Sequence, residues 1–229
     1  MKTSLAALAI VLLGTPVLVT AAEPNHADRI LADTPGLVTL FDNDAGRVEV
    51  FRHGGTSREL TFHGGAIVRE PLVEIDFLGD WSAPSASDRK TALRQRTEQI
   101  SASEGFQGTA AYGIRTTGLL ISARDVIATG KLNDLHIQAK IDAAMTSGSL
   151  PNRDANVIHL IFLAPALQST LGDGVALRDY HSYHSHFHTQ DVNVRYVVVP
   201  YDADASRMAD AARASLLRAI INPDGDGWY

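Results

Sequence analysis

The chain has 229 residues, of which 45% are hydrophobic and 20% are charged, and its formal net charge is −6 at pH 7. This composition is typical of a globular protein and is too acidic for the basic footprint of a nucleic-acid-binding protein. The sequence contains no cysteine, which excludes disulfide bridges and a cysteine-linked lipid, so packing must supply the stability.

Residues 1–22 are predicted to be a secretory signal peptide of bacterial type. Lys2 gives the positive start, Leu5–Val19 form the apolar run, and the small residues Val19 and Ala21 suit a cleavage site. The run is short for a membrane-spanning helix and contains a glycine and a proline, although an uncleaved anchor is the alternative. We therefore expect a periplasmic or secreted protein whose mature chain has no membrane span.

Residues 23–36 are polar, contain two prolines and are interpreted as a linker, and residues 37–229 as a single domain. Strands are predicted at 37–41 and 47–52, joined by a turn rich in Asp, Asn and Gly that favours a hairpin. Further strands are predicted at 58–62, 72–78, 118–123, 156–163 and 192–199. The run at 156–163 is almost entirely apolar, which is typical of a central strand buried on both faces.

Three helices are predicted among these strands. They cover residues 85–100, residues 133 or 134 to 145, and residues 204 or 206 to 221. In the second helix, Leu135, Ala139, Ile141 and either Ala143 or Met145 are expected to face inward, and in the last helix Arg218 is expected to face solvent. Because strands and helices alternate through the second half, the fold class is predicted to be α/β, a mixed sheet with packed helices.

The sequence DYHSYHSHFHT at 179–189 contains four histidines. On an extended chain, His184, His186 and His188 share one face and His181 lies on the other. Imidazoles on one strand face can converge on a zinc ion, which needs three or four ligands. Two alternatives stay open: structural histidines bonded to the backbone and solvent, and a tract that captures metal without chemistry.

Five segments occur in an order that resembles a known family: HGGAIVREPLVEIDFLGDW at 63–81, LHIQAKIDAAMTSGSLPNRDANVIHLIFLAP at 135–165, DYHSYHSHF at 179–187, VRYVVVPY at 194–201 and INPDGDGWY at 221–229. From His63 onward the chain is similar to the phosphate-induced protein 1 family, also called the exordium-like proteins, in a divergent bacterial form. The resemblance implies a zincin-like architecture.

The resemblance also implies a helix of the form His-Glu-x-x-Glu shortly before the NPDGDGWY segment. There the outer residues hold a metal ion and the central glutamate activates water. The register places Ala214, Ser215 and Arg218 at these positions. Ala214 has no donor atom, Ser215 is a poor base and Arg218 is cationic, so no catalytic residue is assigned.

These observations predict an exported, non-catalytic binding protein that acts at the cell envelope or outside the cell, without a cofactor. An envelope or extracellular glycan or protein is the expected ligand. The alternative is a zinc-dependent, zincin-like hydrolase that uses the His181–His188 segment with an acid such as Asp179, Asp191 or Glu74. Within the segment, His184 is the best single candidate for a site position. His159, inside an apolar run, is expected to be a core histidine.

Overall fold

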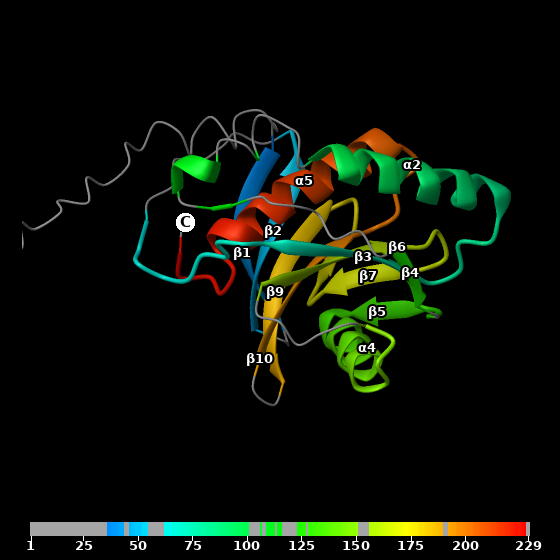
Figure 1. Cartoon of the computed structure of the whole chain (residues 1–229). Coiled ribbons are helices and arrows are strands. Elements are labelled where there is room, and N and C mark those ends of the chain that lie inside the picture. Colours follow the sequence, from blue (N-terminus) through cyan, green and yellow to red (C-terminus); the bar gives the residue numbers. More distant parts are fainter. Residues whose placement is uncertain are drawn as a thin grey trace, which may run out of the picture.

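A seven-stranded mixed sheet forms the centre of the molecule, with helices on both of its faces (Figure 1). The computed structural model describes residues 36–43, 46–54, 62–100, 106, 109–112, 114–115, 123–126, 128–150, 156–189 and 192–227. The predicted signal peptide and residues 23–35 of the predicted linker lie outside these residues. No helix in the described ranges is long and apolar enough to cross a membrane.

The strand order in the sheet is β1-β2-β9-β10-β6-β3-β4. The strands are β1 (Gly36–Asn43), β2 (Gly46–His53), β3 (Leu72–Leu78), β4 (Ala123–Val126), β6 (Val157–Leu163), β9 (Ser182–Thr189) and β10 (Val192–Val199). A second sheet has the order β5-β7-β8, from β5 (Lys131–Asn133), β7 (Gln168–Leu171) and β8 (Gly174–Val175). The mixed sheet confirms the predicted fold class.

Strands β10, β6, β3 and β4 are parallel and carry most of the core. From β3 the chain runs outward to β4 and then returns to the other side of β3 to form β6. This is doubly wound connectivity, with the change of direction between β3 and β6. Strand β6 is buried at every position after its first residue, as its apolar run predicted.

Helices α2 (Pro84–Ile100) and α5 (Ala205–Ile221) lie on one face of the sheet, and α4 (Asp134–Thr146) lies on the other (Figure 1). All three predicted helices are confirmed. Asp204 caps α5 by accepting a hydrogen bond from the Ser206 amide at 2.8 Å. Asn133 caps α4 in the same way, accepting from the His136 amide at 2.9 Å.

The predicted inward face of α4 is confirmed for Ile141 and Met145 and wrong for Leu135 and Ala139. Leu135 is 45% exposed and Ala139 is exposed, whereas Ile137, Ile141 and Met145 are buried. The phase of the helix is set by Asp134, whose buried carboxylate accepts hydrogen bonds from tyrosines of the sheet. Residues three and seven positions after Asp134 therefore face the sheet, and Leu135 is turned toward solvent.

The hairpin of β1 and β2 is confirmed, with Asn43 paired to Gly46 at its end. Of the predicted strand at 118–123, residues 118–122 lie outside the described residues, and Ala123 is the first residue of β4. All but the last residue of the predicted strand at 58–62 lies outside them as well. Strands β5, β7 and β8 were not predicted, because they have only two to four residues each.

Candidate functional site

The histidine segment forms strand β9, which lies between β2 and β10. From Ser182 onward its side chains alternate between the two faces of the sheet, as predicted, but His181 precedes β9 and contacts α5 on the same side as His184, so its predicted place on the other face is wrong. The Ser182 hydroxyl donates to the Ala211 carbonyl of α5 at 2.8 Å, and the hydroxyl of the next residue, Tyr183, donates to Asp134 of α4 at 2.8 Å. His184 therefore faces α5, on the side of the sheet where Ala214, Ser215 and Arg218 lie.

His184 belongs to a buried polar cluster beside the end of α5. Its Nε2 atom lies 3.1 Å from the Asn222 carbonyl oxygen and 3.5 Å from Oε2 of Glu49, which is its register partner on β2. Arg218 donates a hydrogen bond to Glu49 Oε1, and the Asn222 side-chain amide lies 3.3 Å from Glu49 Oε2. We call these four residues, Glu49, His184, Arg218 and Asn222, the Glu49 cluster.

The electrostatics of the Glu49 cluster favour a neutral imidazole. Burial lowers the pKa of His184, and the charge of Arg218 lowers it further, while Glu49 acts in the opposite direction. Within the described residues, Nδ1 of His184 and Nε and Nη1 of Arg218 have no hydrogen-bond partner. One carboxylate therefore faces one guanidinium in the protein interior. Removing these two charges from water costs free energy that their mutual attraction must offset.

The expectation that Arg218 faces solvent is wrong, because its side chain is 2% exposed. Helix α5 lies across β2 and β9, and Glu49 offers a buried counter-charge there. Ala214 and Ser215 are buried on the same helix, and the Ser215 hydroxyl lies 2.7 Å from that of Ser182. The three metal-helix positions thus lie against the strands that carry His184 and Glu49, in packed contact with them.

His181 has a separate environment at the other end of α5. Its Nδ1 atom accepts from the His53 amide at 3.3 Å, and its Nε2 atom lies 3.1 Å from Nη2 of Arg207. Burial, with the neighbouring His53 and Arg207, lowers the pKa of His181 to about 4. Arg207 and Arg218 are separated by about 16 Å along the helix axis, at 1.5 Å per residue. His181 and His184 therefore contact different parts of α5.

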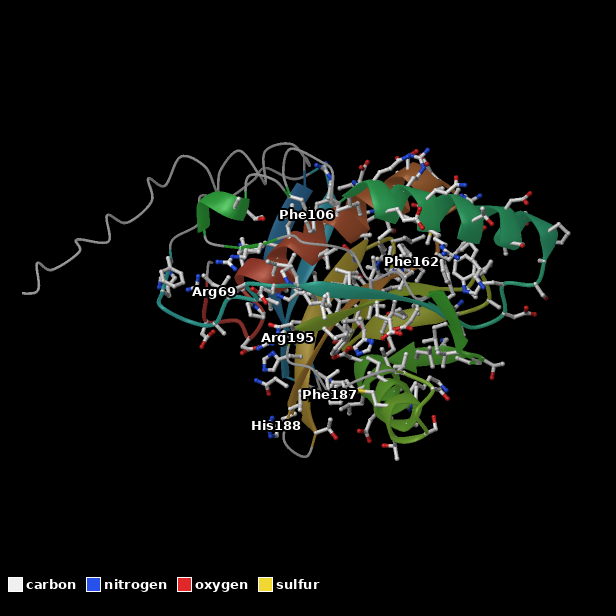
Figure 2. All side chains as sticks on the ribbon, viewed as in Figure 1. Arg69, Phe106, Phe162, Phe187, His188 and Arg195 are labelled. Atoms are coloured by element: carbon white, nitrogen blue, oxygen red, sulfur yellow. The ribbon has the colours of Figure 1, made fainter. Side chains whose placement is uncertain are left out.

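The two remaining histidines lie toward the end of β9. His188 is exposed near the tip of the β9–β10 hairpin, with Nδ1 2.9 Å from Oδ1 of Asn193 (Figure 2). His186 is half-buried and pairs in register with Arg195, whose guanidinium donates two hydrogen bonds of 3.0 Å to Asp224. No group of three or more His, Asp or Glu side chains that could hold a metal ion occurs within the described ranges.

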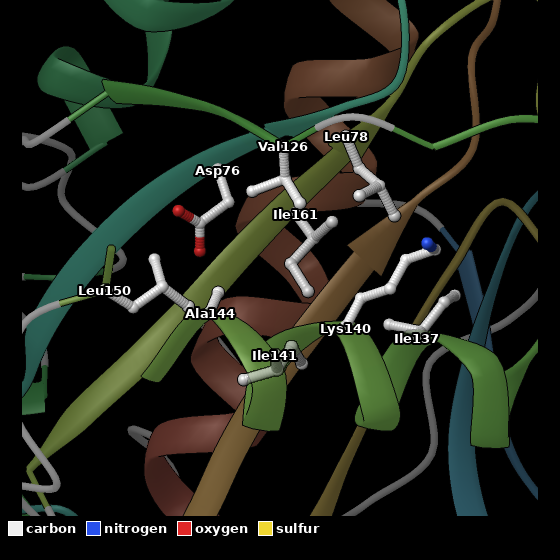
Figure 3. Close-up of a pocket in the computed structure, with 9 residues that line it drawn as sticks. All are labelled: Asp76, Leu78, Val126, Ile137, Lys140, Ile141, Ala144, Leu150 and Ile161. Atoms are coloured by element: carbon white, nitrogen blue, oxygen red, sulfur yellow. The ribbon is translucent and has the colours of Figure 1, made fainter. Parts of the chain in front are cut away.

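The opposite face of the sheet holds a second set of buried ionisable groups. Nδ1 of His159 lies 3.2 Å from Oδ2 of Asp76 and 3.9 Å from Oε2 of Glu74, so His159 is a core histidine, as predicted. Asp76 and Lys140 are the charged residues lining a small cavity under α4 (Figure 3). Its volume of about 10 Å³ is at the lower limit for one water molecule, so it cannot hold a larger ligand.

Helix α4 is fixed to the sheet by a network around Asp134. The hydroxyl groups of Tyr183 and Tyr196 each donate to Oδ1 of Asp134 at 2.8 Å. The Gln138 side-chain amide donates to the Tyr196 hydroxyl at 2.9 Å and to Asp134 Oδ2 at 3.2 Å. Burial raises the pKa of both tyrosines, and the Asp134 charge raises them further. These tyrosines are therefore structural donors.

The glycine-rich segment at 63–65 packs against the turn that follows α5. The His63 amide donates to the Gly227 carbonyl at 2.9 Å, and the Ala66 amide donates to Asp226 Oδ1 at 3.2 Å. A Cβ atom at Gly65 would lie 2.1 Å from the Asp226 carbonyl oxygen, so only glycine fits there. The HGG and NPDGDGW segments, distant in sequence, thus form one packed unit.

Glu49 is the site residue that sequence reasoning missed. It lies between two valines in the sequence VEVF, with a bulky apolar residue two positions later, so an alternating strand places Glu49 and Phe51 on one face. An acidic residue at an inward position of an amphipathic strand requires a buried partner. That requirement was the available signal, and the partner is Arg218.

Comparison of the chain with protein-family models, with curated proteins and with solved structures gives no match. The function is therefore inferred from the residues and their geometry.

Proposed function

We propose that the protein is an exported, non-catalytic binding protein, similar to the exordium-like proteins and built on a zincin-like α/β scaffold. It acts at the cell envelope or outside the cell. The observation that supports this function is the buried pair of Arg218 and Glu49 beside His184, at the place where the resemblance expects a metal-binding helix.

The chemistry of the pair opposes metal-dependent hydrolysis. A catalytic zinc site needs about three protein ligands, an open position and a neighbouring base. Here a guanidinium lies against the carboxylate, and its positive charge repels a metal ion at short range. The Ser215 hydroxyl, at the position of the base, is bonded to Ser182. An ion could bind only after Arg218 had left its buried position.

A binding function is consistent with the structural role of the buried polar groups. The Glu49 cluster on one face of the sheet and the Asp134 network on the other are engaged in packing helices α5 and α4. The small cavity under α4 is too small for a ligand. A ligand would therefore be bound on the outer surface, and the predicted export places that surface in contact with envelope or extracellular glycans and proteins.

The decisive experiment is a metal inventory and a hydrolysis assay on mature protein purified without a histidine tag. We expect no stoichiometric metal, and no cleavage of casein or a peptide library with or without added zinc. One zinc per chain together with chelator-sensitive cleavage that is lost in His184→Ala, but kept in the exposed His188→Ala, would overturn the proposal.

Export is tested separately by mass spectrometry of the protein recovered from the periplasm or medium of an expressing bacterium. The signal-peptide prediction expects a chain that begins near Ala22 or Glu23. Recovery of a chain that still begins at Met1 would contradict it.

A further inference from the structure

An open groove follows the outer side of helix α4. Its volume is about 600 Å³, which is within the range of ligand-binding pockets. One wall is the helix itself, and the other is the segment that leads from β4 into β5. We call it the α4 groove. Its charged side chains are Lys131 and Lys140, His136 also lines it, and its apolar surface includes Leu132, Ala139 and Ala143.

The helical wall of the α4 groove is a regular stripe. His136, Ala139, Lys140 and Ala143 are spaced at i, i+3, i+4 and i+7, so they share one face of α4. The stripe next to it packs on the sheet and is held there by the Asp134 network. The alanine methyl groups of the groove wall are exposed. The wall is therefore a rigid surface with a small-residue floor.

Lys140 is positioned by packing. It lines the small cavity between α4 and the sheet as well as the α4 groove, and it is half-buried (Figure 3). A lysine in this position covers apolar surface with its methylene stem while its ammonium group stays hydrated. Its charge is thereby held at the groove with fewer accessible rotamers than a fully exposed lysine has.

The α4 groove is positively charged on an acidic protein. Among the described residues that line it, two are lysines, one is a histidine and none is acidic, whereas the chain as a whole has a net charge of −6. The two acidic residues of α4 are engaged elsewhere: Asp134 is buried against the tyrosines, and Asp142 accepts from the Thr189 hydroxyl at 2.8 Å. The groove is therefore complementary to a negatively charged ligand.

We propose that the α4 groove binds an acidic peptide segment of a partner protein. Its carboxylates would pair with Lys131 and Lys140, and its apolar side chains would cover Ala139 and Ala143. This inference rests on the proposed binding function and narrows its ligand. A sugar is less well matched, because the described lining residues include no Phe, Tyr or Trp ring on which it could stack.

The test is a titration of the full mature chain with a fluorescently labelled synthetic peptide made of three Glu-Ala-Glu-Leu repeats. We expect saturable one-to-one binding that weakens about tenfold or more in Lys131→Glu/Lys140→Glu. The matched control is Arg94→Glu/Arg96→Glu, the same change of charge at two exposed sites on α2, across the sheet from the groove. The control should bind within about twofold of the wild type. Ala139→Trp, which fills the floor without changing charge, should also weaken binding.

Three outcomes would overturn the inference. One is no saturable binding of the acidic peptide by the wild type. A second is an equal loss of affinity in Arg94→Glu/Arg96→Glu, which would show that only net charge matters. A third is tight binding of polygalacturonate, lost in the lysine variant, without peptide binding.

Thermal melts confirm that each variant is folded, and the single variant Lys131→Glu, at an exposed site, replaces the double variant if that one unfolds. Metal content and hydrolysis are measured without the peptide. If the peptide does not bind, the non-catalytic assignment is therefore still decided by those two measurements.

Discussion

The two faces of the central sheet bury polar groups in different ways. On the α5 face, the charged pair of Glu49 and Arg218 lies beside His184, and several of their nitrogen atoms have no hydrogen-bond partner within the described residues. On the α4 face, the Asp134 carboxylate accepts from two tyrosine hydroxyl groups in bonds of normal length. Both arrangements hold a helix against the sheet.

The two arrangements differ in how much stability is lost when one of their side chains is removed. A buried ion pair gains its stability from mutual neutralisation, so the loss of one partner leaves a buried charge. When a carboxylate that accepts from hydroxyl groups is removed, those hydroxyl groups lose their hydrogen bonds, but the groups left in the interior are neutral. The α5 face should therefore be the more sensitive to a single substitution and the better rescued by a paired one.

The largest effect is expected for Arg218→Met. The variant leaves Glu49 buried without its counter-charge, and the free energy of unfolding should fall by about 3–5 kcal/mol in urea denaturation. Adding Glu49→Gln removes the stranded charge, and the double variant should recover a large part of the loss. If the two substitutions were simply additive, the pair would not be coupled and the comparison of the two faces would fail.

A smaller effect, about 2–3 kcal/mol, is expected for Asp134→Ala on the α4 face, because two buried hydroxyl groups lose their acceptor. The double-mutant cycle uses Tyr196→Phe. In the wild-type background, Tyr196→Phe should cost about 1 kcal/mol, and in the Asp134→Ala background it should cost nothing or stabilise the fold. An equal cost in both backgrounds would show that the hydrogen bond carries no net stability.

Low pH should also lower the stability of the fold through His181, which contacts α5. His181 has a pKa of about 4 in the folded protein and an ordinary value near 6.5 when unfolded, so the unfolded state binds more protons between these values. Stability is therefore complete above about pH 6.5 and falls as the pH falls toward 4. The slope should not exceed the ~1.4 kcal/mol per pH unit that one full proton gives.

His181→Gln should flatten this part of the stability curve, measured as melting temperature at half-unit steps of pH. The glutamine amide keeps one donor and one acceptor and does not titrate. The tyrosines of the α4 face have raised pKa values and stay protonated through this range. An unchanged pH slope in His181→Gln would assign the acid sensitivity to other groups.

Much of the sheet was predictable because local chemistry and tertiary packing agree in it. The apolar runs of β6 and β10, the alternation of β3 and the caps at Asn133 and Asp204 locate their elements within one or two residues. Periodicity failed where a polar group determines the packing. Asp134 rotates α4 and exposes Leu135, and Glu49 draws Arg218 into the interior.

The same reasoning explains what was predictable in the candidate site. Alternation along the histidine segment gave the correct face for His184, because a strand has a fixed period of two. Its partners come from β2 and from the end of α5, far away in the sequence. No local pattern specifies that β2 pairs with β9, so the Glu49 cluster required the tertiary structure.

The smallest effects are expected at the end of β9, and they separate the histidines from one another. His188 is exposed and His186 is half-buried, so His188→Ala should change the free energy of unfolding by at most about 0.5 kcal/mol and His186→Ala by little more. His184→Ala should cost about 2 kcal/mol, because it removes a buried ring from between Glu49 and the Asn222 carbonyl. The measurement is urea denaturation of the three single variants in a metal-free buffer and again with added zinc. Equal losses at all three positions, or a stabilisation by zinc that each substitution abolishes, would show that the histidines act together as a metal site.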